Sequence, residues 1–228
     1  MNPLELGFRQ GAARLFAPAG ATPVLLAAGV LSAAVAALGS ERGRSAADRA
    51  LISAAFGLAL PLLAFLAAEL AVAGQRFDRA LRVLTRHGIS GRNAGIGLAL
   101  ALAAASAAAA LTVTICSLFA AYPASDPRLW SELALTIPIA MLAGVAYAGW
   151  YTLASSFGAN GGGRQWLLVL DWVFGASSGW LALPFPRGHL RNLLGGAPVA
   201  EMSQGSALGI LAVGTGLALV IGLFRSAD

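Results

Sequence analysis

One uncharged stretch of the chain constrains its fold more than any other feature. Residues 94–122 contain no Asp, Glu, Arg, Lys or His, and about 20 mostly apolar residues are enough for a helix to cross a bilayer. Lipid offers the backbone no hydrogen bonds, so such a run is expected to be helical. Five further apolar runs are separated by short polar gaps. The sequence therefore predicts an all-α polytopic membrane protein with about six transmembrane spans, at residues 21–38, 51–73, 94–122, 132–157, 165–183 and 207–224.

The composition excludes several classes of function. Of the 228 residues, 58% are hydrophobic and 11% are charged, whereas a soluble domain carries about 25% charged residues. We therefore expect a single transmembrane domain over residues 1–228. All 15 basic residues are Arg, and without Lys the chain cannot form the phosphate-binding loop of an ATPase. With one Cys and two His far apart in the sequence, we predict no catalytic, cofactor or metal site.

The positions of the Arg residues predict the orientation of the chain. We expect residues 1–17 to form an amphipathic helix on the membrane surface, because Asn2 can cap it and Leu4, Phe8 and Leu15 share one face. If the N-terminus is cytoplasmic, nine of the 15 Arg lie on the inner side and six on the outer side. This bias predicts that both termini are cytoplasmic. Arg residues confined to short gaps indicate contact with membrane lipids and not with nucleic acid.

The connection between the second and third predicted spans is basic and amphipathic. Within GQRFDRALRVLTRHGISGR, residues 74–92, we predict a helix over residues 75–87 with Phe77, Leu81 and Leu84 on one apolar face. Its basic side chains are those of Arg76, Arg79, Arg82 and Arg86. Two interpretations remain open. The helix either anchors on anionic lipid or docks on a cytoplasmic partner, with its apolar face as the anchor.

The segment before the last predicted span is apolar but broken by Pro and Gly. Residues 184–204 contain Pro184, Pro186, Pro198 and paired glycines at 195 and 196. Non-helical backbone at membrane depth is tolerated only against protein or a water-filled cavity. We therefore predict a re-entrant hairpin on the outer side of the membrane.

Two acidic residues lie inside predicted spans. Asp171 lies about seven residues beyond Arg164, and a charge at the centre of a membrane costs about 2.5–3.5 kcal/mol on insertion scales. Asp171 should therefore face the protein interior, either in a pathway or as a structural hydrogen-bond partner. Glu69 lies nearer the inner interface, where we expect it to pair with the nearby Arg cluster.

The two segments described above carry a resemblance to a known family. The stretch GQRFDRALRVLTRHGISGR is similar to the coupling-helix region of the membrane subunit of type-2 ABC exporters, the group of polysaccharide, drug and haem exporter permeases. DWVFGASSGWLALPFPRGHLRNLLGG, residues 171–196, looks like the fifth span and outer hairpin of that family. Glu69 and Gly74 match its acid in the second span and its Gly before the coupling helix. Gly88 stands where the family often has Pro.

The resemblance implies a function and partners for the chain. It implies a permease subunit that forms the path of an ATP-driven exporter in the bacterial cytoplasmic membrane, as a homodimer or a heterodimer with another permease. Each copy would dock a separate ABC ATPase subunit, which supplies the nucleotide site that this chain lacks. The coupling residues would be Arg76, Phe77, Arg79, Leu81, Arg82, Leu84 and Arg86. The alternative is a non-transporting membrane scaffold or assembly subunit of a larger complex.

Overall fold

The computed structural model describes residues 2–16, 21–37 and 43–225, and all regular structure in these ranges is helical. The predicted all-α class is therefore confirmed. The elements are α1 (Pro3–Leu15), α2 (Ala21–Ala37), α3 (Arg44–Arg49), a π-helical segment (Ala50–Ala59), α4 (Leu60–Ala71), α5 (Phe77–Ala80), α6 (Arg82–Arg86), α7 (Gly91–Ala121), α8 (Pro127–Ser155), a short 3-10 turn (Ala159–Gly161), α9 (Gly163–Val173), a second 3-10 turn (Trp180–Ala182), α10 (Pro186–Leu193) and α11 (Gln204–Phe224).

Four helices of the described chain are long and apolar enough to cross a membrane. The first runs from Arg44 to Ala71 through α3, the π-helical segment and α4, and the others are α7, α8 and α11. At about 1.5 Å per residue, 21 to 31 residues span roughly 32–47 Å, which exceeds a hydrocarbon core of about 30 Å. The fold is thus compatible with a multi-pass membrane protein.

One of the six predicted spans is shorter than expected. The first predicted span is helical over all its described residues, since α2 has 17 residues, or roughly 25 Å, and residue 38 lies outside the described residues. α9 has only 11 residues, or roughly 16 Å, so it reaches about half-way through a bilayer. The prediction of a continuous span over residues 165–183 is therefore wrong.

Arginines of the following segment explain why α9 ends early. Nη2 of Arg191 donates to the carbonyl oxygen of Ser177 at 2.7 Å, and its Nη1 donates to that of Ala176. Nη1 of Arg187 donates to the carbonyl oxygen of Trp172 at 3.2 Å. These donors satisfy carbonyl groups that a longer helix would have bonded internally. The apolar composition up to residue 183 therefore does not extend the helix.

Helix caps explain why two spans begin before their apolar runs. α7 begins at Gly91, because Oγ of Ser90 accepts the N–H of Asn93 at 3.4 Å. α8 begins at Pro127, because Oδ1 of Asp126 accepts the N–H of Arg128 at 2.9 Å and Pro suits the first helical turn.

The helix Arg44–Ala71 also begins earlier than the predicted residue 51. Its first turns are helical but polar, with Arg44 and Asp48 4.0 Å apart on one face. A search for apolar residues alone misses turns of this kind.

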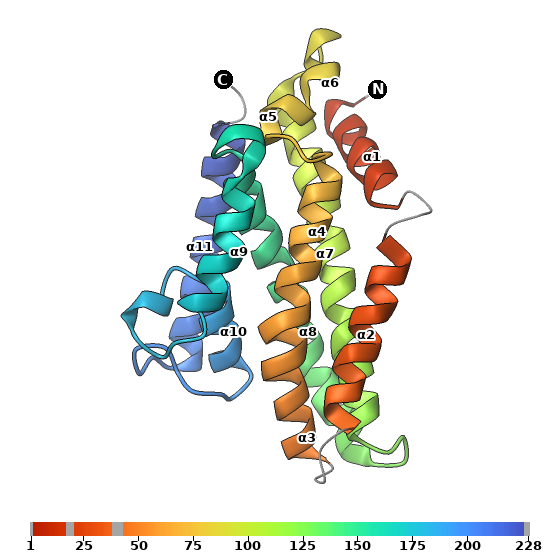
Figure 1. Cartoon of the computed structure of the whole chain (residues 1–228), viewed down its shortest axis with the longest axis vertical. Helices are drawn as coiled ribbons and strands as arrows, with labels where there is room; N and C mark the ends of the chain where they lie inside the picture. The colour runs from red at the N-terminus through yellow and green to blue at the C-terminus, as the bar shows by residue number, and fades with distance from the viewer. Residues whose placement is uncertain (1, 17–20, 38–42, 226–228) are drawn as a thin grey trace.

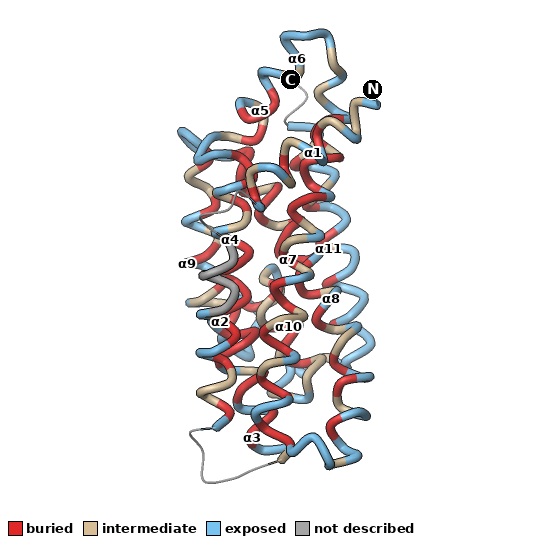
Figure 2. Tube along the Cα trace, turned by 90° about the vertical axis from the view of Figure 1, so that its right-hand side faces the viewer, coloured by how far each residue is buried: buried red, intermediate tan, exposed pale blue. Residues whose placement is uncertain are grey.

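The helices form an elongated bundle with α7 at its centre. α7 packs against α1, α2, α4 and α8, while α11 packs on α8 and α10 packs on α11. The start of α1 and the end of α11 lie at the same end of the bundle as α5 and α6, and α3 lies at the opposite end (Figure 1). Many residues along α11 are exposed (Figure 2). Of its apolar 18-residue stretch, 28% is buried inside the chain, compared with 61% for the helix Arg44–Ala71. α11 therefore belongs to the periphery of this chain.

α1 packs more deeply into the bundle than the predicted surface helix. Gly7 and Gly11 are buried, whereas Phe8 remains partly exposed. A Cβ placed at Gly97 of α7 would overlap the carbonyl oxygen of Leu4 and lie 2.6 Å from the backbone nitrogen of Phe8. The two helix backbones thus approach closely where one of them has glycine, as small residues permit in membranes.

Candidate functional site

A buried arginine joins three segments at the end of the bundle that carries α5 and α6. Arg164, the second residue of α9, is 1% exposed, and its Nε and Nη2 donate to Oε1 and Oε2 of Glu69 on α4 at 2.8 and 3.0 Å. Its Nη1 donates to the carbonyl oxygen of Gln75 at 2.9 Å. A guanidinium that holds both oxygens of one carboxylate fixes direction as well as distance.

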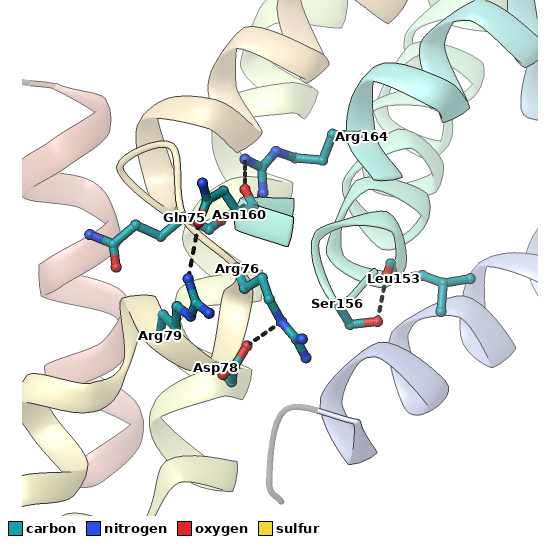
Figure 3. A network of polar contacts seen from close by, with 8 residues as sticks. All are labelled: Gln75, Arg76, Asp78, Arg79, Leu153, Ser156, Asn160 and Arg164. Atoms are coloured by element: carbon teal, nitrogen blue, oxygen red, sulfur yellow. Dashed lines mark hydrogen bonds and ion pairs between the residues drawn. The ribbon is translucent and has the colours of Figure 1, made fainter. Parts of the chain in front are cut away.

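Arg79 extends this network to α5. Its Nη1 donates to Oδ1 of Asn160 at 3.0 Å, and the carbonyl oxygen of Asn160 accepts from Nη2 of Arg164 at 3.4 Å (Figure 3). Asn160 has a φ of 54°, a left-handed conformation that Asn tolerates better than most residues. We call Glu69, Gln75, Arg79, Asn160 and Arg164 the basic joint. It ties α4, the loop before α5, and the α8–α9 turn into one unit.

α1 is attached to the same region through two side chains. Nε2 of Gln10 donates to the carbonyl oxygen of Ala80 at 3.0 Å, and Nη1 of Arg14 donates to that of Ala71 at 2.8 Å. Both carbonyls lie at helix C-termini, where the backbone has no helical partner. Burial lowers the pKa of the Arg14 guanidinium from its ordinary value. α1 therefore braces the ends of α4 and α5.

The apolar face of the basic connection points into the chain. Phe77 and Leu81 are each 1% exposed and pack over Gly95 of α7, and Leu84 is half-buried. The connection is two short helices, α5 and α6, separated at Leu81, and not the predicted single helix over residues 75–87. The expectation that Phe77 and Leu81 anchor a partner is therefore wrong for this structure, because α7 already covers them.

The opposite face of the connection is exposed and basic. Arg79, Arg82 and Arg86 are exposed, and Val83 between them is 61% exposed. The guanidinium groups of Arg82 and Arg86 have no ion-pair or hydrogen-bond partner among the described residues. Arg76 instead pairs with Asp78 at 3.0 Å. The surface open to a partner is thus made by Arg82, Val83 and Arg86.

Glu69 has a different partner from the one expected. It binds Arg164, 95 residues later in the chain, and not an Arg of the neighbouring cluster. The sequence held a usable signal, which our interpretation missed. Arg164 begins a short apolar helix directly after a Gly-rich turn, and an Arg buried there requires a carboxylate. Glu69 is the acid inside a predicted span at the same expected interface.

Asp171 lies in the interior, between α9, α8 and the segment before the last span. It is 1% exposed. Oδ2 accepts the hydroxyl of Tyr147 at 2.8 Å, and Oδ1 accepts the backbone N–H of Arg187 at 3.3 Å. Tyr151 stacks on Tyr147 and donates its hydroxyl to the carbonyl oxygen of Pro61 at 3.0 Å. Neighbouring helices thus supply donors that offset the cost of a buried carboxylate.

The predicted hairpin over residues 184–204 contains α10 and an irregular return to α11. Nε of Arg191 donates to the carbonyl oxygen of Ala197 at 3.0 Å, Nδ2 of Asn192 donates to that of Met202 at 3.0 Å, and Nε2 of His189 lies 2.8 Å from that of Leu183. α10 packs against α8, α11 and the π-helical segment. Side chains of α10 therefore close the segment on itself against these helices.

In the part of the chain that the structure describes, no three His, Cys, Asp or Glu side chains gather in a group that could hold a metal ion. Comparison with known proteins found no family model that matches the chain and no significant match to a curated protein. A functional assignment therefore rests on the arrangement of the bundle and on its polar sites.

Proposed function

We propose that the chain is a permease subunit of an ATP-driven ABC exporter, which docks a separate ATPase through α5 and α6. The observation that carries this proposal is that α5 and α6 combine an exposed basic surface with hydrogen bonds that fix them to the rest of the bundle. Arg82, Val83 and Arg86 face outward, while the basic joint and α1 tie the same connection to α4 and α9. A surface that transmits force to membrane helices needs such a rigid attachment.

The spans and their polarity support the proposal. Four helices of the described residues are long and apolar enough to cross a membrane, and both ends of the described chain lie beside the basic connection (Figure 1). On the positive-inside rule this end is cytoplasmic, which is where an ATPase would bind. We further propose that the chain dimerises with a second permease in the bacterial cytoplasmic membrane.

The test is to purify the chain with its ATPase subunit and to measure ATP hydrolysis and pull-down. Replacing Arg82 and Arg86 together by Ala should weaken ATPase binding about tenfold, equivalent to about 1.4 kcal/mol, because interface charges steer and orient association. The matched control replaces Arg44 and Arg49 by Ala, since these residues lie at the opposite end. That variant should bind the ATPase normally.

A negative result favours a different function. If no ATPase co-purifies, or if both double variants bind it as the unaltered chain does, the coupling role is refuted. The chain would then be better described as a non-transporting scaffold or assembly subunit.

A further inference from the structure

A pocket of about 230 Å³ with both polar and apolar lining lies between α10 and the π-helical segment of the first long span. We call it the hairpin pocket, and its lining residues are Ile52, Ser53, Phe56, Ala176, Arg187 and Arg191. Ser53 and Ala176 are exposed, so the pocket opens at the surface of this chain. It is much larger than the roughly 30 Å³ that one water occupies in the liquid.

The hairpin pocket holds two positive charges without an ion pair. Among the described residues, no carboxylate oxygen lies within 4.0 Å of either guanidinium. Arg191 donates to three backbone carbonyls. Arg187 uses only Nη1, toward Trp172, of the five N–H donors that a guanidinium offers. Asp171 supplies one negative charge beside two positive ones, and its contact is with the backbone of Arg187.

The free side of Arg187 faces the π-helical segment. Its Nη2 lies 3.2 Å from the position that a Cβ at Gly57 would occupy, so the absence of a side chain at Gly57 leaves room for the guanidinium. Ile52 and Phe56 place apolar surface next to these donors. An occupant should therefore have an anionic head beside an apolar part.

The hairpin pocket lies beside a helix that can cross a membrane, and this position bears on the role of its two arginines. Ser53 lies four residues after Arg49, the last charged residue before the apolar part of this helix, or roughly 6 Å along it. Ionisable side chains inside a membrane pair with one another or with backbone carbonyls, or line a path for ions or substrate. Arg187 and Arg191 bond backbone carbonyls but no carboxylate, so their positive charge remains available to an anion.

We propose that the hairpin pocket binds the phosphate group of an anionic amphiphile, the substrate class of the exporter. That the amphiphile is a substrate rests on the proposed function, whereas the binding site itself is inferred from the geometry of the pocket. Two guanidiniums can engage different oxygens of a tetrahedral phosphate, whereas a planar carboxylate is satisfied by one bidentate guanidinium. The apolar wall formed by Ile52 and Phe56 receives the adjoining hydrocarbon.

The first experiment measures the electrostatic potential of the hairpin pocket. Cys116 is the chain's only cysteine, so a Cys116→Ala, Ser53→Cys variant carries one thiol at the pocket mouth. In neutral detergent, a sulfonate-bearing methanethiosulfonate should modify this thiol faster than a trimethylammonium-bearing one. Adding Arg187→Gln should lower the ratio of the two rates about fourfold, because one nearby unit charge changes each rate about twofold, in opposite directions for the two probes.

A matched control separates the pocket from general surface charge. Arg44→Gln removes the same charge from an exposed site at the start of the helix that carries Ser53, and it should leave the rate ratio unchanged. If Arg187→Gln does not fold, Arg191→Lys, which keeps the charge, should fold and preserve the ratio. A thiol that reacts with neither probe, or equally with both, overturns the proposal.

The second experiment asks which phosphate the hairpin pocket takes. Phosphatidic acid, inorganic phosphate and diacylglycerol are added in turn to the Ser53→Cys variant, and modification by the sulfonate probe is timed. Protection by phosphatidic acid alone supports an amphiphile, while equal protection by inorganic phosphate assigns the site to a free phosphate instead. Protection by diacylglycerol, or by none of the three, overturns the phosphate site.

These measurements need no ATPase, so they can fail independently of the proposed function. Protection by phosphatidic acid without any co-purifying ATPase would leave a lipid-binding site in a chain that is not an exporter subunit. An ATPase complex whose hairpin pocket shows neither charge preference nor protection would retain the exporter role and remove this substrate class.

Discussion

The basic joint and the hairpin pocket both place arginines among apolar helices, but they balance the charge in different ways. In the basic joint, Arg164 is almost fully buried and holds the carboxylate of Glu69 with two hydrogen bonds. In the hairpin pocket, Arg187 and Arg191 are half-buried and donate to backbone carbonyls. The charge of Arg164 is balanced by a carboxylate of the chain, whereas the charges of Arg187 and Arg191 are not.

This difference separates a structural role from a binding role. A buried pair leaves no capacity for a ligand, and breaking it exposes an uncompensated charge. Carbonyl partners orient a guanidinium without neutralising it, so an anion can still gain from its charge. We therefore expect substitutions in the basic joint to alter stability, and substitutions in the hairpin pocket to alter binding.

The largest effect on stability should come from Phe77, on the buried apolar face of α5. Phe77→Ala should lower the free energy of unfolding in mixed micelles by about 3–5 kcal/mol, since a buried aromatic leaves a cavity. Val83→Ala on the exposed face is the matched control and should change it by less than about 0.5 kcal/mol. Equal small effects would show that Phe77 is not packed against α7 and that the anchor interpretation should be restored.

A double-mutant cycle on Glu69 and Arg164 should give the next largest effect. Each single change, Glu69→Gln or Arg164→Gln, should cost about 3 kcal/mol of unfolding free energy, at the low end for broken buried pairs because Glu69 is 27% exposed. The double variant should cost little more than either single one. Arg44 and Asp48, an exposed pair 4.0 Å apart, form the control cycle, whose coupling should be about 0.5 kcal/mol or less.

That second prediction has a clear contrary outcome. If the costs at Glu69 and Arg164 simply add, the two residues act independently. The basic joint would then be no more than two polar neighbours, and its contrast with the hairpin pocket would disappear.

The helical class was predictable, and the early end of α9 was not. Uncharged runs such as residues 94–122 identify α7, because lipid requires internal backbone bonding over the whole run. Hydropathy wrongly predicted that the helix continues over residues 174–183. The side chains of Arg187 and Arg191, which lie later in the chain, bond carbonyl groups there and end α9. A contact between distant residues has no signature in the periodicity of the segment that it interrupts.

The candidate sites show the same division. The pattern of Phe77, Leu81 and Arg82 correctly placed apolar and basic side chains on different faces of the connection. It could not tell whether the apolar face meets lipid, a partner or the chain itself, because all three surroundings select the same residues. The structure gives the answer, because Phe77 and Leu81 are each 1% exposed and lie against Gly95 of α7.

The smallest expected effect concerns Asp171, which adjoins the hairpin pocket. Tyr147→Phe removes the hydroxyl that donates to Asp171 at 2.8 Å and should lower the free energy of unfolding by about 1–2 kcal/mol, the range for interhelical hydrogen bonds to a charged group in membranes. Tyr151→Phe is the matched control. Its hydroxyl donates to a neutral carbonyl at 3.0 Å, so its loss should cost about 0.5–1 kcal/mol. The Arg187 backbone N–H still bonds Asp171, which is why the loss should stay below that at Arg164. If Tyr147→Phe costs as much as Arg164→Gln, Asp171 belongs to a rigid joint of the same kind as Glu69. If, in addition, the rate ratio at Ser53→Cys does not depend on Arg187, the two results together would remove the distinction between the two regions.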